Sequence, residues 1–483
     1  MRYGLVCRVL GLIGAIVSLS MLWPLWWSLK DGSADRIPFI CGIAIGLGIG
    51  VVLYCLGRGQ DYQELGIREA FAVVSLSWIL ASSIGAVPFY MAGTTSTYTD
   101  AFFEAMSGFT TTGASILSDI ESNPRGILFW RSLTHWLGGM GIIVLSLAVL
   151  PFIGVGGMQL FKAEVPGPTP EKLTPRVQQT AVLLWGVYVL LSFLEVLALS
   201  IAGMNLFDAL THTFGTMATG GFSPLNGSVG QFHNPVFDWI IIVFMFLAGA
   251  NFALHYMVLQ GKLLALWYDE EFRFYFKVIA FSSLSIMAFL MFSGSYSSLE
   301  KAFRDATFQV VSIVTTTGYA TADFDTWPQY TRFLLLLLMF IGGCAGSTGG
   351  GIKNVRIMVV LRRVGVELRR LLHPQQLIKM RLNGRPLRED IITSVTAFFL
   401  LYMVLFAVGT AAMAAMGLDL LSALSSVAAT LGNIGPGLES VGPTQNYGAI
   451  CIPGKWLLSL FMLLGRLEIF TVIMLFMPGT WRQ

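Results

Sequence analysis

A short segment that ends in glycine occurs four times in this chain and constrains the fold more than any other feature. The copies are Thr110-Thr111-Thr112-Gly113, Ala218-Thr219-Gly220-Gly221, Thr315-Thr316-Thr317-Gly318 and Gly432-Asn433-Ile434-Gly435. A second mark keeps the same register: Asp100-Ala101, Asp208-Ala209, Asp305-Ala306 and Ser422-Ala423 each begin thirteen residues before the glycine of their copy. Four copies in one register predict four related structural units around a common axis.

The composition is that of a chain that crosses a membrane several times. Apolar residues make up 55% of the 483 residues and charged residues 12%, against about 45–50% and about 25% in soluble domains. The net charge of +3 gives no reason to expect a nucleic-acid partner. The five cysteines show neither disulfide nor metal-site spacing. Membrane lipid is therefore the surrounding we expect.

Ten apolar stretches approach or exceed the roughly 20 residues that a membrane-spanning helix needs. They are residues 8–29, 38–57, 70–92, 127–152, 180–203, 236–260, 276–294, 328–361, 391–417 and 454–478. The eighth is interrupted by the glycine-rich run GGCAGSTGGG at 342–351. Because backbone that faces lipid does not tolerate such a break, this run has to lie within protein or line a water-filled cavity.

Four moderately apolar segments of about 10–15 residues lead into the glycine-ended copies, and they are too short to span. We expect each to be a re-entrant half-helix, with Asp100, Asp208 and Asp305 as helix caps. The predicted fold is an all-α polytopic membrane protein with four fused helix–half-helix–helix repeats around one central pore. The predicted units are an amino-terminal two-helix hairpin (1–60), pore repeat one (70–155), repeat two (180–262), repeat three with a broken second helix (276–365), a basic cytoplasmic linker (366–390) and repeat four (391–483).

The distribution of basic residues predicts the orientation. With ten crossings both termini lie on one side, which then holds 21 of the 30 Lys and Arg residues, whereas eight lie on the other side and Arg466 lies within the membrane. The positive-inside rule makes the richer side cytoplasmic. All four half-helices then enter from the outer face.

The glycine-ended copies have the chemistry of a filter built from backbone carbonyls. Glycine reaches backbone conformations that are closed to other residues, and threonine adds a hydroxyl with little bulk. None of the sixteen positions is Asp or Glu, which argues against a carboxylate ring and favours a weakly hydrated monovalent cation. We expect all sixteen residues to line the path of a potassium ion, and a gated potassium pore is the leading hypothesis.

Two features below this filter are candidates for a gate. The first is the glycine-rich run Gly343, Cys344, Ala345, Gly346, Ser347, Thr348, Gly349, Gly350 and Gly351, which could plug the pathway and withdraw. A phosphate-binding loop is the less favoured interpretation, because Lys353 is displaced by one position and no Ser or Thr follows it. The second is Arg466, the only arginine deep in a spanning stretch. It either faces the pore and repels cations, or pairs with Glu468 or with carbonyls of the interrupted run.

Several motifs give the chain a specific resemblance over essentially its whole length. They are HWLGGMGIIVL at 135–145, GGMQL at 156–160, PGP at 166–168, GGCAGSTGGGIK at 342–353, NIGPGL at 433–438 and GRLEIF at 465–470. With these motifs the chain resembles the TrkH/KtrB/HKT superfamily of potassium-uptake proteins.

The resemblance implies properties that the residues alone do not establish. They are four fused units around one pore, a homodimer in the bacterial inner membrane, potassium as the transported ion without an organic cofactor, and a cytosolic TrkA-like nucleotide-binding subunit that controls opening. The resemblance also implies that Gly113 goes with potassium selectivity, since a serine there marks sodium-permeable plant relatives.

Two other classes of function compete with a pore. A secondary transporter that couples potassium to protons or sodium is the second hypothesis, but four direct repeats in one orientation favour the pore. A membrane enzyme is the third, and no metal cluster or nucleophile–base set in the sequence supports it. His135, His212 and His255 lie in or near spanning stretches, where we expect local hydrogen bonding rather than a proton relay.

Overall fold

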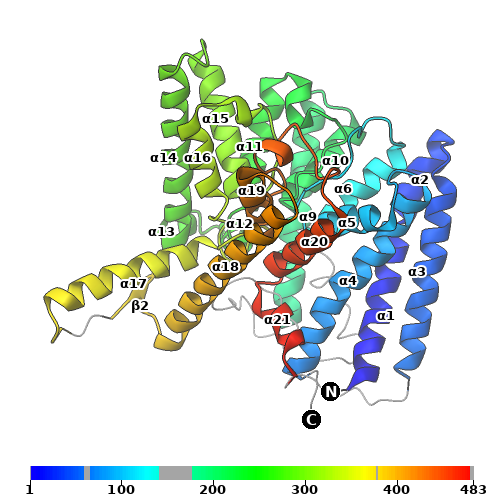
Figure 1. Cartoon of the computed structure of the whole chain (residues 1–483), viewed down its shortest axis with the longest axis horizontal. Helices are drawn as coiled ribbons and strands as arrows, with labels where there is room; N and C mark the ends of the chain where they lie inside the picture. Colours follow the sequence, from blue (N-terminus) through cyan, green and yellow to red (C-terminus); the bar gives the residue numbers. More distant parts are fainter. Residues whose placement is uncertain (1, 59–65, 141–176, 377–378, 479–483) are drawn as a thin grey trace.

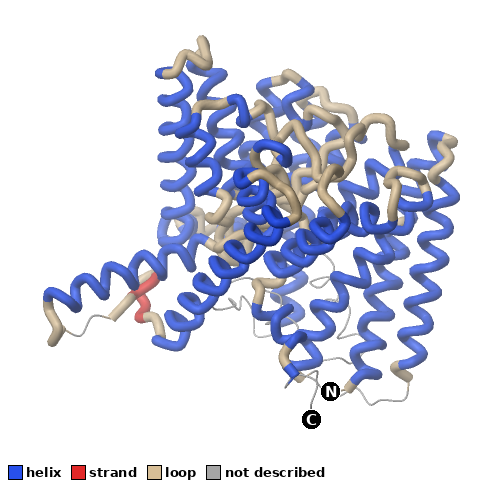
Figure 2. The backbone as a smooth tube through the Cα atoms, viewed as in Figure 1, coloured by secondary structure: helices blue, strands red, loops and turns tan. Residues whose placement is uncertain are grey.

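The computed structural model describes residues 2–58, 66–140, 177–376 and 379–478. Within these ranges the regular structure is helical apart from the short hairpin of β1 (Arg381–Leu382) and β2 (Arg385–Pro386) (Figure 2). The predicted all-α class is therefore confirmed. The end of the expected span 127–152 and the motifs at 156–160 and 166–168 lie outside the described residues.

The helices begin with a hairpin and then follow one order four times: a long helix, a short helix, and a further helix (Figure 1). In the second, third and fourth groups this further helix is broken. The hairpin is α1 (Tyr3–Ser20), α2 (Leu22–Asp31) and α3 (Arg36–Leu56). The next group is α4 (Ile67–Met91), α5 (Tyr98–Phe109) and α6 (Arg125–Met140). It is followed by α9 (Val177–Ile201), α10 (Leu206–Met217), the 3₁₀ turn η2 (Ser228–Phe232), α11 (Pro235–Ala248) and α12 (Phe252–Leu259).

The remaining elements repeat this order twice. The third group is α13 (Ala265–Tyr268), α14 (Glu270–Phe292), α15 (Leu299–Val314), η3 (Phe324–Thr326), α16 (Gln329–Leu338) and α17 (Asn354–Leu372). The fourth is α18 (Glu389–Ala415), α19 (Leu420–Leu431), η4 (Glu439–Val441), α20 (Ile452–Arg466) and α21 (Phe470–Phe476). In Figure 1 α1 begins and α21 ends at the same end of the molecule, and α17 extends away from the bundle.

Six described helices are long and apolar enough to cross a membrane. They are Tyr3–Asp31, Arg36–Leu56, Arg68–Met91, Thr180–Ile201, Glu270–Phe292 and Glu389–Ala415. The bent pair of α11 and α12 makes a seventh if it is counted as one span. The ten crossings expected from hydropathy stay a prediction.

Two stretches expected to be continuous helices are broken, which corrects the expectation of one interruption only. α11 and α12 meet at 101°, where the Asn251 side chain accepts from Ala253 N and starts the new helix. α20 ends at Arg466, and the next helix begins after Glu468 and Ile469, whose φ angles are +54° and +60°. Hydropathy does not detect these breaks, because local capping and backbone conformation end the helices without a change in apolar character.

Small residues let the first two long helices approach closely. On α3, Gly42, Gly46 and Gly50 are buried. A Cβ added at Gly46 would lie within 3.0 Å of the Ser18 side chain, and one added at Gly11 would lie within 3.0 Å of the Gly50 carbonyl. In a membrane the hydrophobic effect does not drive helices together, so close backbone packing of this kind stabilises their association.

The four half-helices are α5, α10, α15 and α19, and each begins at a polar side chain that accepts an amide hydrogen bond from three residues on. The caps and donors are Thr97 with Asp100 N, Asn205 with Asp208 N, Ser298 with Lys301 N, and Asp419 with Ser422 N. Asp100 and Asp208 therefore occupy the third helical position, and Asp305 lies inside α15. The expectation that these three aspartates are the caps is wrong, although the first two still suit the positive end of the helix dipole.

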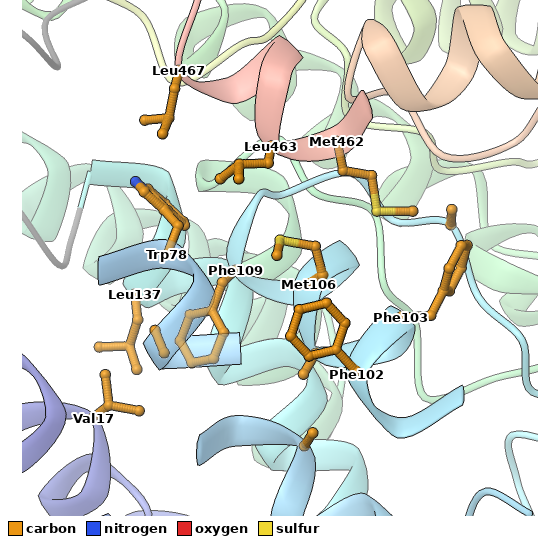
Figure 3. Packing of buried hydrophobic residues seen from close by; sticks show 14 of the residues in the cluster. Val17, Trp78, Phe102, Phe103, Met106, Phe109, Leu137, Met462, Leu463 and Leu467 are labelled. Atoms are coloured by element: carbon orange, nitrogen blue, oxygen red, sulfur yellow. The ribbon is translucent and has the colours of Figure 1, made fainter. Parts of the chain in front are cut away.

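The half-helices are held by packing, since helices of this length are marginal alone. Every residue of α5 from Asp100 to Phe109 is buried. In Figure 3 its side chains Phe102, Phe103, Met106 and Phe109 lie among residues of α4, α6 and α20. The position at which α5 ends is therefore fixed by the surrounding long helices.

Candidate functional site

The four half-helices all end in the same way, at the glycine-ended segments. In every segment the amide of the second residue donates to the carbonyl three positions back, and the amide of the third donates five positions back. This double closure is the Schellman motif, which needs a left-handed residue at the second position. The φ angles there are +53° at Thr111, +54° at Thr219, +60° at Thr316 and +53° at Asn433.

The glycine that ends each segment is left-handed as well. Its φ is +80° at Gly113, +79° at Gly221, +83° at Gly318 and +100° at Gly435. The four segments thus share one backbone conformation although their sequences differ, since the second and fourth lack the triple threonine. The symmetry of the site lies in the backbone.

This conformation uses the amides of the segments and leaves most of their carbonyls free. The first three amides of each segment donate back into the half-helix. Two of the sixteen carbonyls accept from a described residue: Ala218 O from the Thr219 hydroxyl at 2.6 Å, and Gly435 O from the Tyr447 hydroxyl at 2.8 Å. The other fourteen accept no hydrogen bond from the described part of the chain. Free, oriented carbonyl oxygens are the ligands that replace the water around a dehydrated cation.

The four segments form a closed ring. A Cβ added at any of the four final glycines would lie within 3.0 Å of the carbonyl oxygen of the third residue in another segment. The contacts run from Gly113 to Gly220, from Gly221 to Thr317, from Gly318 to Ile434, and from Gly435 back to Thr112. Each segment therefore touches the next, and the fourth touches the first.

The ring separates an open side from a covered side. On one side a cavity of about 150 Å³ is lined by all four final glycines. On the other side the run 343–351 lies against the first two residues of the segments: Gly350 N donates to the Thr316 hydroxyl at 2.7 Å, and a Cβ at Gly350 would lie 2.5 Å from Gly432 O. The Thr348 hydroxyl donates to Met217 O at 3.0 Å, at the end of α10. The run thus covers the ring from the side opposite the cavity.

Arg466 completes this cover on the side of the first repeat. Its guanidinium donates to Thr348 O at 2.7 Å and to Gly138 O and Gly139 O, both at 2.6 Å. It therefore joins the interrupted run to the end of α6. The sequence left two kinds of partner open for Arg466, namely Glu468 and the carbonyls of the run. Arg466 binds a carbonyl of the run, whereas Glu468 pairs with Arg356.

Comparison with known proteins decides the family. A family model for TrkH, described as a cation transport protein, matches residues 39–481. The chain belongs to the TrkH family. The Trk system potassium uptake protein TrkH of Escherichia coli (strain K12) is 43% identical over 488 residues, with 100% of both chains covered. The Trk system potassium uptake protein TrkG of the same strain is 36% identical over 487 residues, which covers 99% of this chain and 98% of TrkG.

A solved structure gives the same result. The crystal structure of the potassium transporter TrkH from Vibrio parahaemolyticus superposes with a TM-score of 0.90 at 38% identity, with 100% of both chains covered. As a TrkH family member with several spanning-length helices, this chain is an integral membrane protein. Its relatives are transport proteins, so the chain is not an enzyme.

All sixteen predicted filter residues lie at the ring of this TrkH family member, and the gate candidates lie beside it. Lys353, which raised the alternative of a phosphate loop, donates to Gly349 O within the run. The three histidines also bond to backbone: His135 Nδ1 to Gly108 O, His212 Nδ1 to Asp208 O and His255 Nε2 to Leu247 O, at 2.7, 2.8 and 2.8 Å.

One residue at the site was missed by sequence reasoning. Glu271, on α14, is 7% exposed, and its Oε1 accepts from Ala345 N at 2.8 Å and from Val355 N at 2.9 Å. It therefore holds the first part of the run and the first turn of α17, which follows the run. Glu271 follows Glu270 in the first turn of α14, where two acidic residues are usual because they interact with the helix dipole. Its hydrogen-bond partners are more than seventy residues away in the sequence, so no local pattern indicates its role.

Proposed function

We propose that this chain takes up potassium through the ring of glycine-ended segments, which acts as a carbonyl filter. The observation that carries the proposal is the closed ring of four Schellman caps with fourteen carbonyls free of hydrogen bonds from the described residues. Glycine and threonine carbonyls present oxygen dipoles without a full charge, which suits a potassium ion that has to leave again. The names of the relatives, potassium uptake protein and potassium transporter, support the same ion.

We further propose that the run 343–351 and Arg466 form the gate, and that the described arrangement is closed. The run and Arg466 together contact all four repeats: α6, the end of α10, the segment at Thr316 and the segment at Gly432. A guanidinium beneath the ring adds electrostatic repulsion for a cation that has passed it. Opening then requires the run to withdraw and Arg466 to exchange its carbonyl partners.

The proposed setting is the bacterial inner membrane, with both termini cytoplasmic and the cavity above the ring facing outward. The excess of basic residues on the predicted cytoplasmic side supports this orientation. We propose a homodimer and a cytosolic TrkA-like nucleotide-binding subunit that controls the gate. The term Trk system in the names of the relatives supports partners of this kind. The units predicted from the sequence, 1–60, 70–155, 180–262, 276–365, 366–390 and 391–483, are part of this proposal.

Flux from purified protein in liposomes tests the function. We expect uptake of potassium that follows the potassium gradient and the membrane voltage, and that is unchanged by an imposed proton or sodium gradient. Uptake that requires one of those gradients would show coupled transport, the alternative function. An absence of potassium flux with gate variants such as Arg466→Ala would reject the filter.

A further inference from the structure

A buried ion pair lies behind the ring, between α5 and α6. Arg131 Nε is 2.6 Å from Glu104 Oε1, and the two side chains are 3% and 0% exposed. Among the ion pairs of the described residues, it alone has both side chains below 5% exposure. A pair this deeply buried is costly to desolvate and needs further hydrogen bonds to be tolerated.

Those further hydrogen bonds go to the two loops that follow Gly113 and Gly221, which we call the outer loops of segments one and two. Glu104 accepts from the Ser115 hydroxyl and from Ile116 N, each at 3.0 Å, just beyond Gly113. Arg131 donates to Ser223 O at 2.8 Å, just beyond Gly221. Its guanidinium also lies 3.8 Å from the ring centre of the neighbouring Phe222. The pair therefore bridges the outer loops of segments one and two.

The other repeats make a comparable contact without charge. Glu104 lies nine residues before the final glycine of its segment, and the residues at that position in repeats two and three also contact the loop that follows their segment. In repeat four the contact is shifted by one residue. The neutral contacts are His212 Nε2 with Ser223 Oγ at 3.1 Å, Gln309 Nε2 with Thr321 Oγ1 at 3.4 Å, and Leu438 N with Ser425 Oγ at 2.9 Å.

The net charge of the Glu104–Arg131 pair affects an arriving cation because the pair lies beside the outer cavity. Arg131 contributes to the lining of the outer cavity, together with Gly113 and Gly221. A lone guanidinium there would repel an arriving cation, and the Glu104 carboxylate compensates it at contact distance. The pair thus supplies several hydrogen bonds to the outer loops without adding net charge at the entrance.

We propose that Glu104 and Arg131 are positioning residues that set ion selectivity by holding the outer loops of segments one and two at a fixed separation. They act through Ser115, Ile116 and Ser223 rather than by contacting the ion. The inference rests on the proposed function, since it requires that the ring carries ions. The backbone conformation of the ring is the same in all four repeats, whereas this charged pair occurs in the first repeat and neutral contacts take its place in the other three.

The test measures sodium and potassium uptake by purified Glu104→Gln and Arg131→Lys proteins in liposomes. Gln keeps the shape of Glu104 without its charge, and Lys keeps the charge of Arg131 without the fork that reaches two acceptors at once. We expect the sodium-to-potassium permeability ratio to rise about tenfold in either variant, as when one hydrogen bond to a charged group is lost. Asp238→Asn is the matched control, because it breaks the ion pair of Asp238 with Arg304 (3.1 Å), which does not contact the outer loops of segments one and two. It should lower thermal stability and leave the ratio unchanged.

The outcomes separate this inference from the function on which it rests. If both variants fold and keep the wild-type ratio while Gly113→Ser alters it, the positioning role is wrong and the filter stands. If Gly113→Ser also leaves the ratio unaltered, the filter itself is in doubt. If Glu104→Gln does not fold, Arg131→Lys decides the question, because it retains the ion pair. An equal rise in the ratio with Asp238→Asn would reduce the effect to general destabilisation and overturn the inference.

Discussion

The Asn433 side chain donates from Nδ2 to the Thr112 hydroxyl at 3.0 Å, which joins the fourth glycine-ended segment to the first. The same nitrogen donates to Met462 O at 2.9 Å, so that one amide ties the ring to α20. Asn433 is also left-handed, with φ of +53°. Asparagine tolerates that conformation better than other residues with a Cβ. Its role therefore has a hydrogen-bonding part and a backbone part, which substitutions can separate.

Asn433→Ala should lose both parts and Asn433→Gly only the first. We expect the alanine variant to be destabilised by about 2–4 kcal/mol, from two hydrogen bonds and the left-handed strain. The glycine variant should be about 1 kcal/mol more stable than the alanine variant, because glycine adopts the left-handed conformation without that strain. Thermal melting of the purified proteins measures the difference. Both variants should also raise sodium uptake relative to potassium. Equal stability of the two variants would remove the backbone part of the argument.

Gly113→Ser should admit more sodium. Its φ is +80°, and a Cβ there would lie within 3.0 Å of Gly220 O, so that the two segments have to separate. We expect at least about a tenfold fall in the potassium-to-sodium uptake ratio, which corresponds to roughly 1.4 kcal/mol. Gly417→Ser is the control: Gly417 is also left-handed, at +100°, but a Cβ there meets nothing within 4 Å. An unaltered ratio in folded Gly113→Ser protein would contradict the filter assignment.

Arg466→Ala should raise the basal flux of the purified protein, measured in the absence of the proposed regulatory subunit. The substitution removes the positive charge below the ring and three hydrogen bonds, to Thr348, Gly138 and Gly139. Hydrogen bonds to charged groups are worth about 1.5–3 kcal/mol each. Their loss should therefore lower the population of the proposed closed state, relative to the open state, several-fold or more. Liposome flux measures the effect. Arg466→Lys keeps the charge but cannot reach all three carbonyls, so its basal flux should lie between that of the wild type and that of Arg466→Ala. Wild-type flux in folded Arg466→Ala protein would exclude this residue from the gate.

Asp419 gives a prediction for acid stability at the outer end of α19. The Ser422 hydroxyl and amide donate to the carboxylate, which lowers the pKa of Asp419 below its ordinary value of 3.8. Because the folded pKa is lower than the unfolded one, the stabilisation is fully present above about pH 4. It is lost as the pH falls through the folded pKa. Asp419→Ala should cost about 1 kcal/mol at neutral pH.

Asp419→Asn separates the cap from its charge. Asparagine is as good a cap as aspartate but does not titrate, so this variant should keep its melting temperature as the pH falls from 5 to 3 more fully than the wild type does. Melting curves across that range measure the effect. An identical acid dependence of the wild type and Asp419→Asn would show that other carboxylates dominate.

The sequence predicted what is local and repeated. The four glycine-ended segments were located from their register alone, because a Schellman cap and a left-handed glycine leave a mark on adjacent residues. It could not identify contacts between distant segments, such as Glu271 with Ala345, because no short-range pattern encodes them. It also misplaced the helix caps, since the residue that recurs, Asp100 or Asp208, lies three positions after the side chain that does the capping.

Because the four caps of the ring belong to one continuous polypeptide, a substitution changes one quadrant and leaves three intact. A ring made of four identical subunits has no such freedom, since every change there occurs four times. The Glu104–Arg131 pair, the Asn433 amide and the glycine run each belong to one repeat only, although their contacts reach neighbouring segments. Support, closure of the ring and covering of its inner side can therefore be altered separately, one at a time, while the shared backbone geometry is preserved.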